Sequence, residues 1–249
     1  MTLPGNLANW LTSPLGQSLL SQEQALLGEA LEDVFGLHLL QVGHWGDHLS
    51  LLGPARVQSK TLWAEEPRAA VDVCCHPEAL PALSDSVDAV LLPHTLEFVD
   101  DAYALLRELD RVLVAEGQLI VLGFNAVGPW SWRHRLTSGG FPPGIQRLLR
   151  EGRLRDWFAL LGFEVVYARR YLFAPPLARL QSDRGRRVFS ALGWLAPPFL
   201  AGAYLLKARK RVYAMRRPKL RWRERRRLVT GMPEPTARLP GTRCPRVRT

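Results

Sequence analysis

The sequence contains little cysteine and has no secretory signal pattern. Only three of its 249 residues are cysteine, and because Cys74 and Cys75 are adjacent they provide neither a disulfide framework nor the spacing of a metal site. The first twenty residues combine neither a basic start nor an uninterrupted apolar run. We therefore expect no metal site and a cytoplasmic location.

Basic residues are scarce in most of the chain and concentrated near its C-terminal end. Residues 207–249 hold sixteen of the 33 lysines and arginines but only two of the 23 acidic residues, so the rest of the chain is mildly acidic. Residues 210–249 have too few apolar side chains to bury a core, which predicts a disordered tail. Such a tail could bind nucleic acid or an anionic membrane surface, or could serve solubility alone.

One long stretch, residues 188–206, carries no charge. Its length approaches that of a membrane span, and basic residues flank both ends. However, Pro197 and Pro198 interrupt it, which favours a helix as far as Leu195, a break, and a final strand over residues 201–208. A membrane-spanning helix and attachment to a membrane surface are the alternatives.

The most informative segment runs from Ser84 to Asn125. It contains apolar runs at 88–92 and 118–124, and neither run alternates apolar with polar residues. This pattern is typical of strands that helices cover on both faces. Between them, residues 102–114 have one apolar face, as expected of a helix that packs on a sheet. The segment therefore predicts a βαβ unit in a parallel sheet.

The flanking sequence predicts further elements of an α/β fold. The segment 10–36 opens with the cap Thr12-Ser13-Pro14 and continues as an amphipathic helical run. Apolar runs predict strands at 37–42, 59–64, 70–75 and 163–173, and residues 153–161 predict a short amphipathic helix. We divide the chain into an N-terminal helical segment (1–36), an α/β domain (37–209) and the basic tail (210–249).

Four motifs in this region resemble the class I S-adenosylmethionine-dependent methyltransferases, in the branch called methyltransferase type 11. They are Val87-Asp88-Ala89-Val90, Leu96-Glu97-Phe98-Val99-Asp100, the helix and turn over 106–117, and Glu78-Ala79-Leu80-Pro81. The resemblance implies a doubly wound, mostly parallel seven-stranded sheet that closes with an antiparallel strand pair. It also implies S-adenosylmethionine as the cofactor and an unidentified methyl acceptor.

The turn after the first strand departs from the family pattern. In the family this turn carries an acidic residue and three glycines, which let the backbone approach the cofactor closely. Here Gln41, Gly43, Trp45 and Asp47 take those four positions, so Gly43 alone is retained, and Gly46 adds a glycine elsewhere. The resemblance implies that Gln41, Gly43, Trp45 and Gly46 line the cofactor site. An ordinary strand-to-helix turn is the alternative.

Two polar residues after the next strands complete the implied cofactor site. Glu65, or its neighbour Glu66, stands where the family has a ribose-binding acid, and His76 stands where it has an aspartate that binds the adenine amino group. A neutral histidine could accept the same hydrogen bond. Leu80 is the remaining implied cofactor contact. Solvated loop residues are the alternative for Glu65 and His76.

His94 is the candidate catalytic residue. It follows the strand 88–92 at its carboxyl end, where open α/β sheets bind their ligands. We expect it to contact the substrate or the sulfonium, or to act as a general base if the acceptor must lose a proton. A structural role in the loop is the alternative.

Residues 125–153 form a predicted loop rich in glycine, proline, tryptophan and arginine. The resemblance implies that this segment builds part of the acceptor pocket, with Trp130, Trp132, Arg133 and Arg135 as substrate contacts. Covering a sheet edge is the alternative role.

The sequence thus leaves three functional hypotheses. Methyl transfer requires that the Trp45 ring leave room for the cofactor. A non-catalytic relative that keeps the fold as a binding module is the second hypothesis, because Trp45 and His76 replace residues that the cofactor usually contacts. A polyanion-binding protein that acts through the basic tail is the third.

Overall fold

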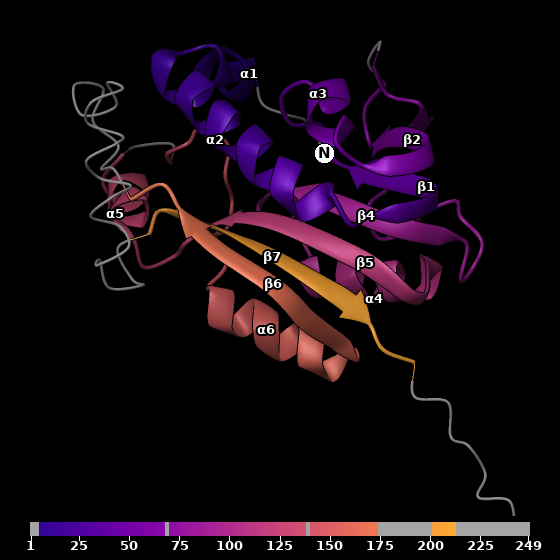
Figure 1. Cartoon of the computed structure of the whole chain (residues 1–249). Helices are drawn as coiled ribbons and strands as arrows, with labels where there is room; N and C mark the ends of the chain where they lie inside the picture. Colours follow the sequence, from indigo (N-terminus) through magenta and orange to yellow (C-terminus); the bar gives the residue numbers. More distant parts are fainter. Residues whose placement is uncertain (1–4, 68–69, 138–139, 174–200, 213–249) are drawn as a thin grey trace, which may run out of the picture. The chain divides into compact units, whose positions relative to one another are not determined.

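The computed structural model describes residues 5–67, 70–137, 140–173 and 201–212 (Figure 1). All of them belong to one compact unit that spans residues 1–213. The predicted helix before Leu195 and almost all of the predicted basic tail lie outside the described residues.

A seven-stranded sheet forms the centre of the described chain. Its strand order is β3-β2-β1-β4-β5-β7-β6, in which β1 to β5 are parallel and β7 runs antiparallel to both neighbours. The strands are β1 (Phe35–Val42), β2 (Arg56–Ala64), β3 (Val73–Cys74), β4 (Val87–Pro93), β5 (Leu113–Phe124), β6 (Phe163–Tyr171) and β7 (Ala203–Lys210). The predicted sheet and its antiparallel strand pair are confirmed. The order reverses between β1 and β4, which is where such sheets bind ligands.

Helices cover both faces of the sheet. Figure 1 shows α2 and α3 on one face and α4 and α6 on the other. The helices are α1 (Gly5–Leu11), α2 (Pro14–Leu31), α3 (His48–Leu52), α4 (Ala102–Val112), α5 (Pro129–Leu136) and α6 (Glu151–Leu160), and η1 (Thr95–Glu97) is a single 3-10 turn. The predicted loop over 125–153 was therefore wrong in part, because α5 occupies its first half.

The two-sided cover explains why the strands read as unbroken apolar runs. In β4, Leu91 packs in the core cluster on the α2 face, whereas Val90 and Leu92 pack in the cluster on the α4 face. In β5, Ile120 packs in the cluster on the α2 face and Val121 in the cluster on the α4 face. From Ala89 to Pro93 and from Leu119 to Phe124, every side chain is thus buried, whichever face it points to.

The N-terminal helical run is two helices. The side chain of Ser13 caps α2 by accepting a hydrogen bond from the backbone N–H of Gly16, as the Thr12-Ser13-Pro14 motif predicts. Pro14 then occupies the first turn, where its missing N–H is not needed. Helix α1 precedes this cap and was not predicted separately.

Among the described residues, we find no helix that is both long enough and apolar enough to cross a membrane. The predicted final strand over 201–208 is present as β7, which pairs with β5 along Ala203 to Arg209. The rest of the uncharged stretch, residues 188–200, lies outside the described chain.

The cap of α4 gives a test of the fold. The Asp101 carboxylate accepts hydrogen bonds from the backbone N–H groups of Tyr103 (2.9 Å) and Ala104 (3.0 Å). Because these donors have no partner within the helix, we expect Asp101→Ala to lower the free energy of unfolding by about 1 kcal/mol. Urea unfolding measures it. Asp100→Ala, at an exposed neighbouring residue, is the control, and an equal loss in both variants would contradict the assigned cap.

Candidate functional site

The turn after β1 and the turn after β4 meet at the carboxyl edge of the sheet. Gly43 has φ +90°, and a Cβ at this position would lie 2.7 Å from the Thr95 side-chain oxygen. The Thr95 hydroxyl donates a hydrogen bond to the carbonyl of Val42. Gly43 is therefore required here for contact between the two turns, and Thr95 occupies the space in front of it.

The Trp45 side chain is directed into the core. It is 0% exposed, and its indole N–H donates a 2.7 Å hydrogen bond to Glu23 of α2. Its ring centroid lies 4.3 Å from that of His94, which in turn lies 4.3 Å from that of Phe124. These rings fill the space at the ends of β1, β4 and β5, so the indole of Trp45 presents no surface to a ligand in this structure.

His94 is equally enclosed. It is 0% exposed and adopts a left-handed backbone conformation, with φ +57°. Its Nε2 lies 2.8 Å from Glu23 Oε1 and its Nδ1 lies 3.0 Å from Glu97 Oε2. Both ring nitrogens are thus engaged, and no part of the imidazole is open to a substrate. The expected substrate contact of His94 stays a prediction, and it requires the imidazole to leave this arrangement.

We call Glu23, His94 and Glu97 the buried triad. Glu23 also accepts a 3.0 Å hydrogen bond from the Tyr171 hydroxyl of β6, and Glu97 accepts one from the backbone N–H of Phe124. The triad therefore ties α2 to β6 and to the turns after β1, β4 and β5. Each carboxylate has several partners, as a buried charge requires.

The triad keeps His94 protonated. Burial by itself lowers the pKa of His94, but the carboxylates of Glu23 and Glu97 outweigh it and raise the pKa to about 9. Burial raises the pKa of Glu97, against the opposing effect of His94. Both ring nitrogens are engaged by carboxylates, and protonation of the imidazole is favoured. This arrangement therefore disfavours His94 as a general base.

Glu65 and His76 come together at the ends of β2 and β3. Both line a shallow depression of about 60 Å³, which Phe98 and Val99 after η1 also border. Glu65 follows β2 and His76 follows β3, and because the two strands are parallel their carboxyl ends lie at the same edge of the sheet. Small-molecule pockets usually have about 300–1,000 Å³. The depression is therefore too small to enclose an adenosine as it stands.

The other implied cofactor residues lie apart from this depression. Gln41 is buried and donates a hydrogen bond to the Gly43 carbonyl, while its own side-chain oxygen has no hydrogen-bond partner. Gly46 lines a separate hollow of about 540 Å³ between α1, α2 and the turn. Leu80 is buried in the core cluster on the α4 face. The implied site thus divides into parts that share no lining residue.

The implied acceptor residues also separate. Trp130 is buried and packs on the Phe141 ring, whereas Trp132 is 68% exposed. The Arg133 guanidinium lies 4.0 Å from the Phe141 ring centroid. Of the four, Arg135 lines a pocket at the carboxyl end of β5.

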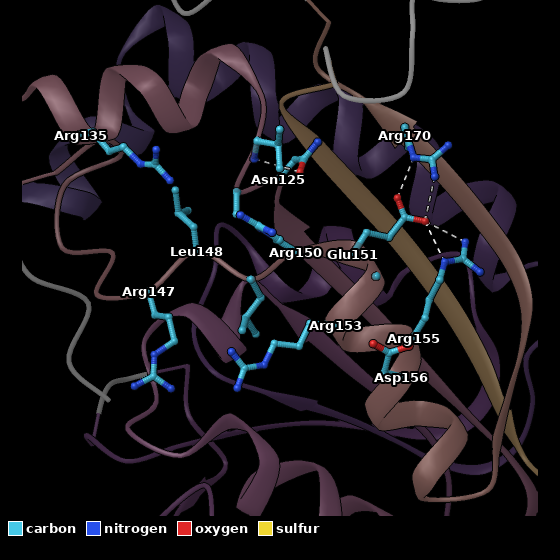
Figure 2. A pocket seen from close by; sticks show the side chains of 14 residues that line it. Asn125, Arg135, Arg147, Leu148, Arg150, Glu151, Arg153, Arg155, Asp156 and Arg170 are labelled. Carbon is cyan, nitrogen blue, oxygen red and sulfur yellow. Dashed lines mark hydrogen bonds and ion pairs between the residues drawn. The ribbon is translucent and has the colours of Figure 1, made fainter.

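That pocket has a volume of about 920 Å³ (Figure 2). It opens beside Asn125 at the carboxyl end of β5 and is bordered by the start of α6. We call it the arginine pocket, because six arginines line it: Arg135, Arg147, Arg150, Arg153, Arg155 and Arg170. Sequence reasoning missed five of them, although the basic run RLLREGRLR over 147–155 was a visible signal.

Metal-binding groups are not gathered anywhere in the described chain. Within residues 5–67, 70–137, 140–173 and 201–212, no three histidine, cysteine or acidic side chains are placed to hold an ion. Cys74 and Cys75 are free thiols, and burial, followed by the neighbouring Cys74, raises the pKa of Cys75 to about 11. A thiol with so high a pKa is a poor nucleophile and a poor metal ligand at neutral pH.

Sequence and fold match one class of proteins. The family model described as "Methyltransferase domain" matches residues 52–121. Among solved structures, a Thermotoga maritima protein described as an S-adenosylmethionine-dependent methyltransferase, possible histamine N-methyltransferase, superposes with a TM-score of 0.60 at 18% identity, covering 82% of this chain and 94% of that one. The chain belongs to the class I S-adenosylmethionine-dependent methyltransferase family.

Curated relatives are similar along about two thirds of the chain. Uncharacterized protein YafS of Escherichia coli K12 is 32% identical over 171 residues, which are 67% of this chain and 69% of YafS. Uncharacterized protein Rv2003c of Mycobacterium tuberculosis H37Rv is 34% identical over 181 residues, which are 68% of this chain and 62% of that protein. The chain thus spans less than two thirds of the mycobacterial relative.

S-adenosylmethionine, which the family implies, fits the described residues only in part. Glu65, His76 and Phe98 border one depression, as an adenosine end requires. At the turn after β1, the side chains of Trp45 and Thr95 are completely buried and offer no contact to the methionine end. The hollow of about 540 Å³ that Gly46 lines at this turn shares no lining residue with the depression. The cofactor as a whole therefore does not fit one continuous cavity in this arrangement.

The buried triad predicts a pH-dependent stability. The pKa of His94 is about 9 in the folded chain and 6.5 without the fold, so protonated His94 stabilises the fold fully below pH 6.5. This contribution is lost as the pH rises through 9. We therefore expect the difference in unfolding free energy between the natural protein and His94→Gln to be largest below pH 6.5 and to shrink towards pH 9.

Urea unfolding at several pH values measures this difference. His38→Gln, at an exposed position in β1, is the control and should leave the pH dependence unchanged. A free-energy difference for His94→Gln that is constant across this range would contradict the assigned protonation of the triad.

Proposed function

We propose that the chain transfers a methyl group from S-adenosylmethionine to an acceptor. The observation that carries this proposal is the meeting of Glu65 and His76 in one depression at the carboxyl edge, on a sheet with the family's strand order. An acid after β2 and a hydrogen-bonding residue after β3 are what a nucleoside needs at this edge. A cytoplasmic location, as the sequence predicts, belongs to the same proposal.

Binding of the whole cofactor requires the Trp45 ring to leave its place. The ring is held by its hydrogen bond to Glu23 and by its contact with His94. When the competent arrangement is a minor one, the apparent affinity falls by the fraction of molecules that adopt it. The proposal therefore includes weak binding of S-adenosylmethionine by the natural protein.

Titration calorimetry with S-adenosylmethionine tests the proposal. We expect binding that weakens about tenfold in Glu65→Ala, because one charged hydrogen-bond acceptor for the ribose is lost. Glu66→Ala is the matched control, since Glu66 does not line the depression. Equal weakening in both variants would argue against the assigned ribose contact.

The Trp45→Ala variant distinguishes a cofactor site that the Trp45 ring blocks from a site that cannot bind S-adenosylmethionine at all. Because the variant removes the ring that fills the turn, we expect it to bind S-adenosylmethionine at least about tenfold more tightly than the natural protein. Loss of a buried tryptophan also destabilises the fold by about 3–5 kcal/mol. Trp130→Ala, at an equally buried ring in α5, controls for this loss and should not improve binding.

A non-catalytic binding module is the second candidate function. The burial of Trp45 and the protonation of His94 favour it, because neither side chain is then available to a cofactor or as a proton acceptor. Absence of binding heat at millimolar S-adenosylmethionine, in both the natural protein and Trp45→Ala, would support this candidate and end the proposal of methyl transfer.

Polyanion binding through residues 210–249 is a separate proposal that rests on charge alone. The fourteen basic residues of this segment would release counterions from nucleic acid or from an anionic membrane. We expect deletion of 213–249 to weaken binding to single-stranded RNA and to anionic vesicles and to reduce its salt dependence. Unchanged affinity after the deletion would refute this role of the tail.

A further inference from the structure

We propose that the arginine pocket binds a small organic molecule that carries a phosphate monoester. Its volume of about 920 Å³ lies within the usual range for small-molecule sites. The pocket opens at the carboxyl ends of β5 and β6, where Asn125 follows β5 and Arg170 is near the end of β6. Open α/β sheets bind ligands at this edge.

The positive charge of the pocket is only partly neutralised. Glu151 pairs with Arg155 at 2.8 Å and with Arg170 at 2.6 Å, so one carboxylate is shared by two guanidinium groups. Four further arginines have no carboxylate partner within the described part of the chain: Arg135, Arg147, Arg150 and Arg153, of which Arg153 lies over the Trp157 ring. Cations without a carboxylate partner around one cavity repel one another, and an anion bound between them relieves this repulsion.

The unpaired arginines come from separate elements. Arg135 extends from the end of α5, while Arg147 and Arg150 lie in the segment that leads into α6 (Figure 2). The backbone N–H groups of Gln146 and Arg147 donate to the carbonyl of Glu97, which fixes this segment on η1. The arginines are therefore held around the cavity by the fold and are not merely neighbours along one exposed helix.

The chemistry of the lining favours a phosphate monoester. A guanidinium presents paired N–H donors that match phosphate oxygens, and a phosphate monoester carries about two negative charges at neutral pH. Leu148, Leu149 and Val127 add an apolar wall for the organic part of the molecule. Extended nucleic acid would need a basic surface beyond the cavity, whereas the chain before residue 207 is mildly acidic overall.

This binding does not depend on methyl transfer. If the chain does transfer a methyl group, the pocket would hold the charged end of the acceptor. If it does not, the pocket would be the ligand site of a binding module. Titration without S-adenosylmethionine therefore tests the pocket separately from the proposed reaction.

The test is titration calorimetry of the full chain with glycerol 3-phosphate, with uncharged glycerol as the blank. We expect binding of the phosphate ester alone, and a loss of about tenfold or more in Arg150→Ser, because charged hydrogen bonds are removed. Arg107→Ser, an exposed arginine on α4, carries the same charge change and should bind normally. Thermal melting verifies that each variant is folded.

Glu151→Gln gives a test of opposite sign. Removal of the carboxylate frees Arg155 and Arg170, so we expect the phosphate ester to bind several-fold more tightly. A variant that was merely destabilised would not gain affinity. Weaker binding by Glu151→Gln would overturn the assigned charge balance.

Further arms identify the source of the phosphate. Binding to vesicles that contain phosphatidic acid, lost in Arg150→Ser, would support the same phosphate chemistry with a lipid as its source. No binding of either phosphate probe at millimolar concentration would overturn the proposal. It would also be overturned by equal losses in Arg150→Ser and Arg107→Ser, or by binding of single-stranded RNA alone that depends on Arg150.

Discussion

The buried ion pair between Glu23 and His94 is the interaction on which the rest of the structure depends. It joins helix α2 to the turn after β4, and Glu97 completes it from the other side of the imidazole. Taking three ionisable groups out of water is costly, and removal of one partner from such a group usually costs about 3–5 kcal/mol because a buried charge is left uncompensated. The triad is stable here because Trp45, Tyr171 and the Phe124 backbone supply the remaining hydrogen bonds.

This arrangement determines which parts of the carboxyl edge are open. Where Glu23 of α2 bonds to Trp45 and His94, these two side chains pack in the core and present no surface at the turn after β1. Beyond the triad, the segment that carries Arg147 is attached to the Glu97 carbonyl, and the arginine pocket lies open. The family fold is therefore preserved, while the residues at its usual cofactor turn serve packing. The open pocket at the carboxyl ends of β5 and β6 is strongly basic.

Much of the fold could be predicted from the sequence. The strands were recognisable because both faces of the sheet are covered, so that β4 and β5 read as continuous apolar runs. The Thr12-Ser13-Pro14 cap located the start of α2, and the order of the strands brought Glu65 and His76 to one edge. These features depend on local pattern and on topology, which are both visible in a linear sequence.

The site was less predictable because its contacts join distant residues. The direction of the Trp45 ring depends on Glu23, 22 residues away on another element, and His94 is enclosed by the same carboxylate, 71 residues away. Helix α5 was expected as a loop because its glycine- and proline-rich flanks conceal a short helix. The arginine pocket gathers Arg135, Arg150 and Arg170 from α5, from the start of α6 and from β6, and no spacing along the chain indicates that they meet.

The exchange rate of the Trp45 indole N–H with solvent tests the central claim most directly. Nuclear magnetic resonance of the full chain, with the signal assigned by its absence in Trp45→Phe, reports this proton. We predict that in the free protein it exchanges as slowly as the amides of β4 and β5, because the indole is enclosed and bonded to Glu23. Rapid exchange, like that of an exposed tryptophan such as Trp132, would show that the ring is not held by the triad and would contradict the account.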